Sequence, residues 1–380
     1  MPIPIVDSHI HLFPASHLPT LAWYGPDSPL GSQHSVDEYR RATSSIPTTK
    51  SSSEEKYLHG FIFLETDRIS SIASGPPEDY PGWTHALDEV SFLTRIALGE
   101  PILGEGHGPA DRNICLGIVP WAPVPGGPEA VKEYMVLVKE RTKTEEVWRQ
   151  VRGVRYLFQD KPAGTMDSSK TIEALRWLGK EGLTFDLGVD ARQGGLDQLR
   201  EAVRMMEKVY DGAKEHEKVT IVISELQCYI SCQFSCSFHL DHFCKPNLRL
   251  SPDAVFTHPE FVEWKDLITR MAQASDTVYM KLSGFFSELP PLSADSDPDI
   301  PGIIDRVQPW TDVVFNEFGA NHVMFGSDWP VCNVGGGGND VSWKRWRQIV
   351  EGILERRGLT ERQKQNVWGQ VAMRAYGIDI

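Results

Sequence analysis

Short runs of apolar and β-branched residues alternate with longer amphipathic segments along this chain of 380 residues. An apolar run of about four to eight residues predicts a buried strand, and apolar residues that recur every three or four positions predict a helix. The pattern predicts strands at Ile3–Ile10, Gly60–Glu65, Ile114–Trp121, Gly153–Phe158, Thr184–Val189, Val219–Ile223, Val278–Leu282 and Val323–Gly326. It predicts helices between them at Ala86–Leu98, Glu129–Arg141, Ser169–Lys180, Leu196–Val209, Phe261–Ala274 and Ile303–Phe318.

An order in which helices follow strands is typical of right-handed βαβ units built on a parallel sheet. Eight such units in this length favour an α/β fold, a single TIM-like (β/α)₈ barrel over residues 1–380. Two doubly wound domains are the alternative, but no glycine-rich dinucleotide fingerprint follows an early strand. We therefore predict one barrel domain with its active site at the carboxyl ends of the strands.

Three segments interrupt the alternation, and each follows a predicted strand. Pro14–Lys56 is rich in proline, serine and threonine and predicts a long loop insertion over the barrel mouth. Ser287–Pro301, with the sequence SELPPLSADSDPDIP, and the glycine run Gly335–Gly338 predict further loops. Long loops are therefore expected at the carboxyl-terminal face, where barrels build active sites.

The stretch VDSHIHLF places two histidines one residue apart behind an aspartate. Alternate side chains of a strand share a face, so Asp7, His9 and His11 are expected to project together. His9 and His11 then lie at the carboxyl end of the first strand and face the barrel axis. A lone histidine is more often a core or capping residue, but two on one face favour a metal or substrate site.

Further polar residues stand at the ends of later strands. Asp328 lies in the turn GSDWP, with Trp329 beside it, and is a candidate general base or metal ligand; otherwise it bonds its own turn. His242, in LDHFCKP, could bind a metal or stabilise charge; otherwise it is a loop histidine. Arg155, in VRGVRYLF, and Glu65, in FIFLETDR, either contact substrate or form salt bridges.

Composition narrows the class of partner. The formal net charge of -14, with 24% charged residues, argues against nucleic acid or an anionic membrane surface, so a small-molecule substrate is expected. No apolar run is long enough to span a membrane, and no signal segment is evident, which predicts a cytoplasmic protein. Six cysteines in a chain of this length do not form a disulfide framework. The oligomeric state is not predicted by any feature of the sequence.

The motifs VDSHIHLF, GVRYLFQ, FDLGV, LDHFCKP and GSDWPV, in this order, resemble the amidohydrolase superfamily of the amidohydrolase-2 type. The branch most resembled contains sugar-lactone hydrolases such as L-rhamnonolactonase and L-fuconolactonase, and the similarity extends to the closing VWGQVAMRAYGI. The resemblance implies a distorted (β/α)₈ barrel with active-site residues His9, His11, His242 and Asp328. It also implies that Arg155 lies near the substrate.

The sequence departs from the superfamily pattern in its metal ligands. Metal-rich members carry a lysine or glutamate after strand four and a histidine after strand five, and neither is found here. A single Zn²⁺ held by His9, His11 and Asp328, or no metal at all, are both open.

The second departure is an interruption of the sixth-strand region, over residues 224–239. In the superfamily TIVI runs directly into LDH, whereas here the segment Ser224–Phe238 stands between them. It contains Cys228, Cys232 and Cys236, which match no common metal site. We interpret it as a lineage-specific insertion or a translated intron, and it bears on the position of His242.

The resemblance and the residues together predict hydrolysis of a sugar lactone. Asp328 is assigned as the base, His9, His11 and His242 polarise the carbonyl, and Arg155, Glu65 and Trp329 bind substrate. No serine lies in a G-x-S-x-G motif, so a covalent acyl-enzyme is not expected. The alternatives are non-oxidative decarboxylation of an aromatic carboxylic acid, and a barrel impaired in catalysis by the interruption. The identity, ring size and stereochemistry of the lactone are not predicted.

Overall fold

The computed structural model describes residues 2–25, 27–49, 55–72, 82–189, 195–224, 247–248, 250 and 254–379. Its strands are β1 Ile3–Ile10, β2 Lys56–Leu64, β3 Cys115–Val119, β4 Gly153–Leu157, β5 Thr184–Gly188, β6 Ile221–Ser224, β7 Val278–Leu282 and β8 Val323–Phe325. Its helices are α1 Val36–Ala42, α2 Thr84–Leu98, α3 Pro128–Arg141, α4 Glu145–Trp148, α5 Ser169–Lys180, α6 Gly195–Tyr210, α7 Pro259–Gln273, α8 Ile300–Phe318, α9 Asn333–Gly336, α10 Ser342–Arg356, α11 Glu361–Gln365 and α12 Val371–Ala375. Each predicted strand and helix is present, most with bounds shifted by a few residues.

All neighbouring strands pair in parallel and in sequence order. They form a sheet β1-β2-β3 and a sheet β4-β5-β6-β7-β8. Isolated bridges join the two sheets at both seams: Ile118 with Val151 and Trp121 with Arg155 on one side, and Ile10 with Trp329 on the other. The eight strands therefore follow the order of a (β/α)₈ barrel, as predicted, with irregular pairing at the seams.

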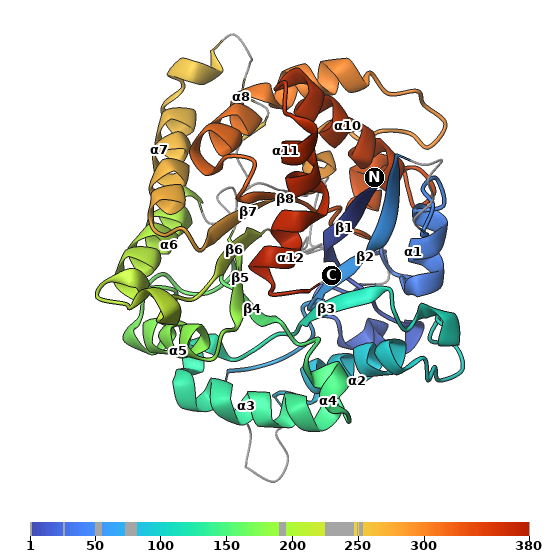
Figure 1. The fold of residues 1–380 in the computed structure, drawn as a ribbon, viewed down its shortest axis with the longest axis vertical. Coiled ribbons are helices and arrows are strands. Elements are labelled where there is room, and N and C mark those ends of the chain that lie inside the picture. Colours follow the sequence, from blue (N-terminus) through green and yellow to red (C-terminus); the bar gives the residue numbers. More distant parts are fainter. Residues whose placement is uncertain are drawn as a thin grey trace.

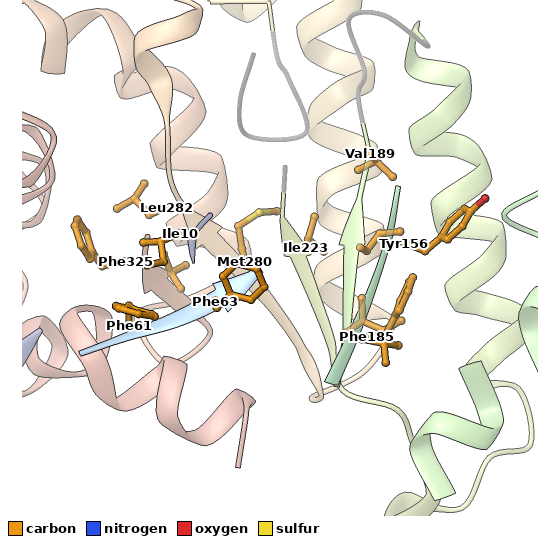
Figure 2. Close-up of a cluster of buried hydrophobic side chains, with 14 of the residues drawn as sticks. Ile10, Phe61, Phe63, Tyr156, Phe185, Val189, Ile223, Met280, Leu282 and Phe325 are labelled. Carbon is orange, nitrogen blue, oxygen red and sulfur yellow. The ribbon is translucent and has the colours of Figure 1, made fainter. Parts of the chain in front are cut away.

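The helices surround the strands, as Figure 1 shows for α3, α5, α6, α7, α8 and α10. Most of the buried apolar side chains form one cluster that includes residues of both sheets and of these helices. Figure 2 shows members of this cluster carried by both sheets, including Ile10 and Phe61 from one and Phe185 and Ile223 from the other. Residues of both sheets therefore share one core, and the division of the chain into a single domain stays a prediction.

A second, smaller cluster closes one end of the strands. Val6, Ile62 and Met324 project from β1, β2 and β8 and pack against Val371 and other residues of the C-terminal segment. The hydroxyl of Thr184, the first residue of β5, donates to the carbonyl oxygen of Ala375 at 2.7 Å. The C-terminal segment therefore covers the amino ends of the strands, where α12 lies across the centre in Figure 1, and the carboxyl ends face the opposite way.

The segment Pro14–Lys56 is more ordered than the loop that its composition predicts. Its described residues contain a 3₁₀ helix at Ala15–Thr20 and α1, and Lys56 already belongs to β2. Leu18, Leu21, Trp23 and Leu30 pack in a small cluster with Phe13 and Val331. The prediction of a long loop is wrong in this respect, because buried apolar residues within the segment pack against Phe13, Val331 and the main core.

The interruption of the sixth strand is only partly described. β6 ends at Ser224, one residue beyond the predicted Ile223, so Ser224 belongs to the strand and not to the interruption. Residues 225–246, including His242 and the three cysteines of the interruption, lie outside the described residues. Across the part of the chain that is described, no helix is long and apolar enough to cross a membrane.

Candidate active site

The first strand does not alternate regularly between its two faces. Its pairing with β2 is irregular between Asp7 and Ile10, and Val6 and Ile10 pack in different clusters although regular alternation would place them on one face. The expectation that Asp7 projects with His9 and His11 is therefore wrong, because the strand irregularity between them changes the face.

Asp7 instead stabilises the packing of the strand against two helices. Its Oδ2 accepts hydrogen bonds from the hydroxyl of Tyr39 on α1, at 3.0 Å, and from Nε1 of Trp343 on α10, at 2.9 Å. Its Oδ1 accepts from the backbone N–H of Ser327 at 2.7 Å. Burial raises the pKa of Asp7, although these hydrogen bonds oppose the shift. Asp7 is thus a buried structural carboxyl group that joins β1 to the segment after β8.

His9, His11 and Asp328 converge at the carboxyl ends of β1 and β8, and all three are fully buried. Nε2 of His9 lies 3.1 Å from Oδ1 of Asp328, and Nε2 of His11 lies 3.2 Å from the same oxygen. The two Nε2 atoms are 3.1 Å apart. The three residues predicted as metal ligands therefore each offer one atom to a common point.

The backbone around Asp328 explains how the carboxylate reaches this point. The backbone N–H of Asp328 donates to the carbonyl oxygen of His9 at 2.8 Å, which ties the turn to the first strand. Asp328 has φ 58°, a left-handed conformation that aspartate adopts more readily than most residues. Gly326 precedes the turn, and a Cβ there would lie 2.8 Å from Cβ of His9. The absence of a side chain at 326 thus lets β8 approach the histidines.

The tautomer of His11 follows from its surroundings. Its Nδ1 lies 2.9 Å from the carbonyl oxygen of Glu65 and 3.1 Å from that of Leu64, so it carries the proton as a donor. Burial lowers the pKa of His11, Asp328 opposes this shift and the charge of Arg155 adds to it. The neutral ring then presents a lone pair at Nε2.

The lone pair of His11 Nε2 faces a carboxylate oxygen and a second imidazole nitrogen at hydrogen-bonding distance. Such atoms repel unless a proton or a cation lies among them. Imidazole nitrogens and a carboxylate oxygen are the donor set that Zn²⁺ takes in catalytic sites, and an imidazole whose other nitrogen donates to a carbonyl is typical of a metal ligand. The residues present therefore fit one divalent metal ion.

Glu65 and Arg155 lie beside this cluster. Nη1 of Arg155 donates to the carbonyl oxygen of Glu65 at 3.4 Å and lies 3.8 Å from its Oε1. Oε2 of Glu65 accepts from the backbone N–H of Asp67 at 2.6 Å. Burial raises the pKa of Glu65 to about 8, against the charge of Arg155. The salt-bridge interpretation therefore holds for Arg155, whose Nε lies 3.5 Å from Oδ1 of Asp186, whereas Glu65 is a neighbouring carboxyl group that is mostly protonated near neutral pH. Contact of either residue with substrate stays a prediction.

Trp329 has a position in the core. Its side chain is fully buried, its Nε1 donates to Oδ1 of Asn339 at 2.8 Å, and its ring lies 5.3 Å from that of Tyr39 and 5.5 Å from that of His34. These contacts pack the turn after β8 against α1 and its preceding loop. A role in binding substrate stays a prediction for Trp329.

Sequence reasoning missed a buried polar cluster between the strands. Asp186 on β5 pairs with Lys281 on β7 at 2.6 Å and with Arg155 on β4 at 3.5 Å, and it accepts a hydrogen bond from Tyr376. The signal was available, because the strands TFDLG and VYMKL each carry a charged residue in a run that is buried on both faces. A charge in such a run needs a partner inside the barrel.

The strand order and a buried His-His-Asp cluster at the carboxyl ends of the strands are the features of a (β/α)₈-type barrel enzyme with one candidate metal site. A family model described as Amidohydrolase matches residues 116–378. The chain belongs to this amidohydrolase family.

Individual relatives agree with this assignment. The chain is 30% identical over 375 residues to L-rhamnono-gamma-lactonase of Scheffersomyces stipitis, and the match covers 98% of both proteins. It is 24% identical over 237 residues to L-fucono-1,5-lactonase of Burkholderia multivorans, covering 61% of this chain and 65% of the relative. A crystal structure of an amidohydrolase from Burkholderia multivorans with bound zinc has a TM-score of 0.62 at 21% identity, over 99% of each chain. The last comparison shows the likeness of fold.

Proposed function

We propose that this protein hydrolyses the lactone ring of an aldonolactone or a similar lactone by attack of water on the ring carbonyl. The observation that carries the proposal is the convergence of His9, His11 and Asp328 on one point, in a chain similar over almost its whole length to an L-rhamnono-gamma-lactonase. The relative's name favours a lactone of a deoxy sugar as the substrate.

Asp328 is the general base of the proposed reaction. Its carboxylate takes a proton from the attacking water and returns it to the ring oxygen when the acyl carbon–oxygen bond breaks, so the product is a hydroxy acid. His9, His11 and Asp328 would hold the single divalent ion, with zinc as the first choice. Such an ion, when bound, polarises the carbonyl and lowers the pKa of water.

Arg155 is assigned to binding and orientation. Its guanidinium group is buried beside the histidines, and a planar group with several donors suits the hydroxyl and carboxyl oxygens of a sugar acid. We assign Glu65, beside Arg155, to accept a hydrogen bond from the substrate or donate one to it. His242 stays a sequence-based candidate for stabilising the oxyanion, since it lies outside the described residues.

The test is a panel of five- and six-membered aldonolactones, with acid release read by an indicator dye in weak buffer. The expected result is turnover of at least one lactone well above its spontaneous hydrolysis. Hydroxybenzoic acids are assayed in parallel for release of CO₂. Decarboxylation without lactone turnover would support the alternative activity, and a folded protein with neither activity would indicate an impaired barrel.

A further inference from the structure

The carboxylate of Asp186 is held on both oxygens inside the barrel. Its Oδ2 accepts hydrogen bonds from Nζ of Lys281 at 2.6 Å and from the hydroxyl of Tyr376 at 2.5 Å. Its Oδ1 accepts from the hydroxyl of Ser224 and lies 3.5 Å from Nε of Arg155. All five residues are at least 97% buried. The orientation of Asp186 is therefore fixed by partners from three strands and from the C-terminal segment.

Asp186 is charged in this environment. Burial by itself would raise its pKa, but the positive charges of Lys281 and Arg155, with the hydrogen bonds, lower the pKa below its usual value. The separation of 3.5 Å between Oδ1 of Asp186 and Nε of Arg155 makes the contact an ion pair, and its electrostatic attraction is strong because both groups are buried. Asp186 can thus set the direction in which the guanidinium of Arg155 points.

Arg155 joins this cluster to the proposed active site. Its Nε faces Asp186, whereas its Nη1 donates to the carbonyl oxygen of Glu65. The same carbonyl oxygen lies 2.9 Å from Nδ1 of His11, whose Nε2 faces Asp328. A continuous series of polar contacts therefore leads from Tyr376, at the amino ends of the strands, to the histidines at their carboxyl ends.

We infer that Tyr376, through Asp186, is a positioning residue that fixes the guanidinium of Arg155 for the substrate. The inference rests on the proposed function, because it gives Arg155 a substrate to orient. Tyr376 follows α12, so the C-terminal segment that closes the barrel also supports the geometry of its active site. Removing the Tyr376 hydroxyl takes away one of the two donors to Oδ2 of Asp186, so that Lys281 alone holds this oxygen and the carboxylate can shift, with Arg155, from its present orientation.

The test is a double-mutant cycle in kcat and KM between Tyr376→Phe and Arg155→Lys. Tyr376→Phe removes one oxygen atom, and Arg155→Lys keeps the charge but loses the planar fork. Tyr279→Phe is the matched control, since Tyr279 packs in the same cluster as Tyr376 and no contact places its hydroxyl on Asp186. We expect Tyr376→Phe to lower kcat/KM about tenfold, mainly through KM, and the control to change it less than about twofold.

The cycle separates positioning from a merely structural role. If Tyr376 acts through Arg155, its substitution has little further effect in the Arg155→Lys background. An equal tenfold loss in both backgrounds, or no loss from Tyr376→Phe in the native background, would overturn the inference.

A measurement that needs no turnover separates this inference from the proposed function. In ¹⁵N-arginine-labelled protein, the Nε–H resonance that Arg155→Lys removes reports the surroundings of the Arg155 guanidinium. Tyr376→Phe is expected to shift or broaden this resonance, and Tyr279→Phe to leave it unchanged. A shifted resonance in a protein that hydrolyses no lactone would refute the proposed function and retain the positioning of Arg155 by Tyr376, whereas an unchanged resonance would refute the positioning itself.

Discussion

Nε2 of His11, near the start of the chain, lies 3.2 Å from Oδ1 of Asp328 on the segment after the last strand. This contact links the first strand to the segment after the last one at their carboxyl ends, where the backbone N–H of Asp328 also donates to the carbonyl oxygen of His9. Both groups are fully buried, so the imidazole and the carboxylate act on each other and on substrate with little screening by water. The catalytic proposal depends mainly on this pair.

Replacement of Asp328 by asparagine is expected to lower kcat by roughly 10²- to 10⁴-fold with little loss of stability. Asparagine has nearly the same volume and also tolerates the left-handed conformation at this position, but it cannot take a proton from water. Steady-state kinetics with circular dichroism checks both parts. Full activity in the variant would mean that Asp328 is only a turn residue.

Asp7→Asn is the matched control for that substitution. Asp7 now accepts hydrogen bonds from the N–H groups of Ser327 and Trp343 and from the hydroxyl of Tyr39. The NH₂ group of an asparagine would point its own hydrogens at some of these donors. The expected result is a loss of about 1 to 3 kcal/mol in the free energy of unfolding, with kcat changed far less than in Asp328→Asn. Denaturant titration and the same kinetic assay make the comparison.

The protein is expected to bind at most one divalent ion, weakly enough for dialysis against a chelator to remove it. His9, His11 and Asp328 supply one set of ligands, and the nearby positive charges of Arg155 and Lys281 oppose a second cation. Elemental analysis before and after dialysis gives the stoichiometry, and His11→Ala should reduce it. Two tightly held ions per chain would contradict the assignment.

Gly326→Ala tests the approach of β8 to the histidines. The new Cβ would lie 2.8 Å from Cβ of His9 and 3.2 Å from Oγ of Ser8, which forces a displacement at the proposed metal ligands. We expect the free energy of unfolding to fall by about 1 to 3 kcal/mol and kcat to fall with it. Gly25→Ala is the control, because nothing lies within 4 Å of a Cβ at that position. Equal behaviour of the two variants would refute the close approach.

Glu89, on α2, gives a prediction for the pH dependence of stability. Burial raises its pKa from 4.5 to about 7, against the charge of Arg68 and hydrogen bonds from Thr66. The unfolded chain therefore loses this proton at lower pH than the folded one. As a result, the contribution of Glu89 to the free energy of unfolding is fully present below pH 4.5 and is lost as the pH rises through about 7. The loss is about 3 kcal/mol at most.

Glu89→Gln removes this titration and keeps an oxygen that can accept from Thr66. The free energy of unfolding, measured by denaturant titration at pH 5 and pH 7.5, is expected to fall less with pH in the variant than in the native protein. The same decrease in both proteins would mean that the carboxyl group of Glu89 is ionised throughout this range.

Apolar patterning was sufficient for the eight predicted strands and the six predicted helices, because buried strands and amphipathic helices differ in period, whereas α10 Ser342–Arg356 was not predicted. β1 and β7 have the predicted bounds, and α5 is the predicted Ser169–Lys180. The pairing of His9 and His11 with Asp328 was also predictable, since residues at the carboxyl ends of barrel strands converge.

Other features depend on details that periodicity does not contain. The face of β1 from which Asp7 projects depends on the irregular pairing of that strand. The pairing of Asp186 with Lys281 and Tyr376 joins three distant segments through the barrel interior. The helices within Pro14–Lys56 were concealed by its polar composition. The effect of the interruption on His242 stays a prediction, and a deletion designed to rejoin the sixth strand to LDH should keep Ser224, because that residue completes β6 and bonds to Asp186.

The central claim is that water attacks the carbonyl of a sugar lactone in this site. The most direct measurement is turnover of a lactone in H₂¹⁸O, with the product analysed by mass spectrometry and corrected for the spontaneous reaction. The account predicts hydrolysis well above the uncatalysed rate, with one ¹⁸O in the carboxyl group of the hydroxy acid and none in the hydroxyl released from the ring. No acceleration of any lactone, or ¹⁸O in that hydroxyl, would contradict it.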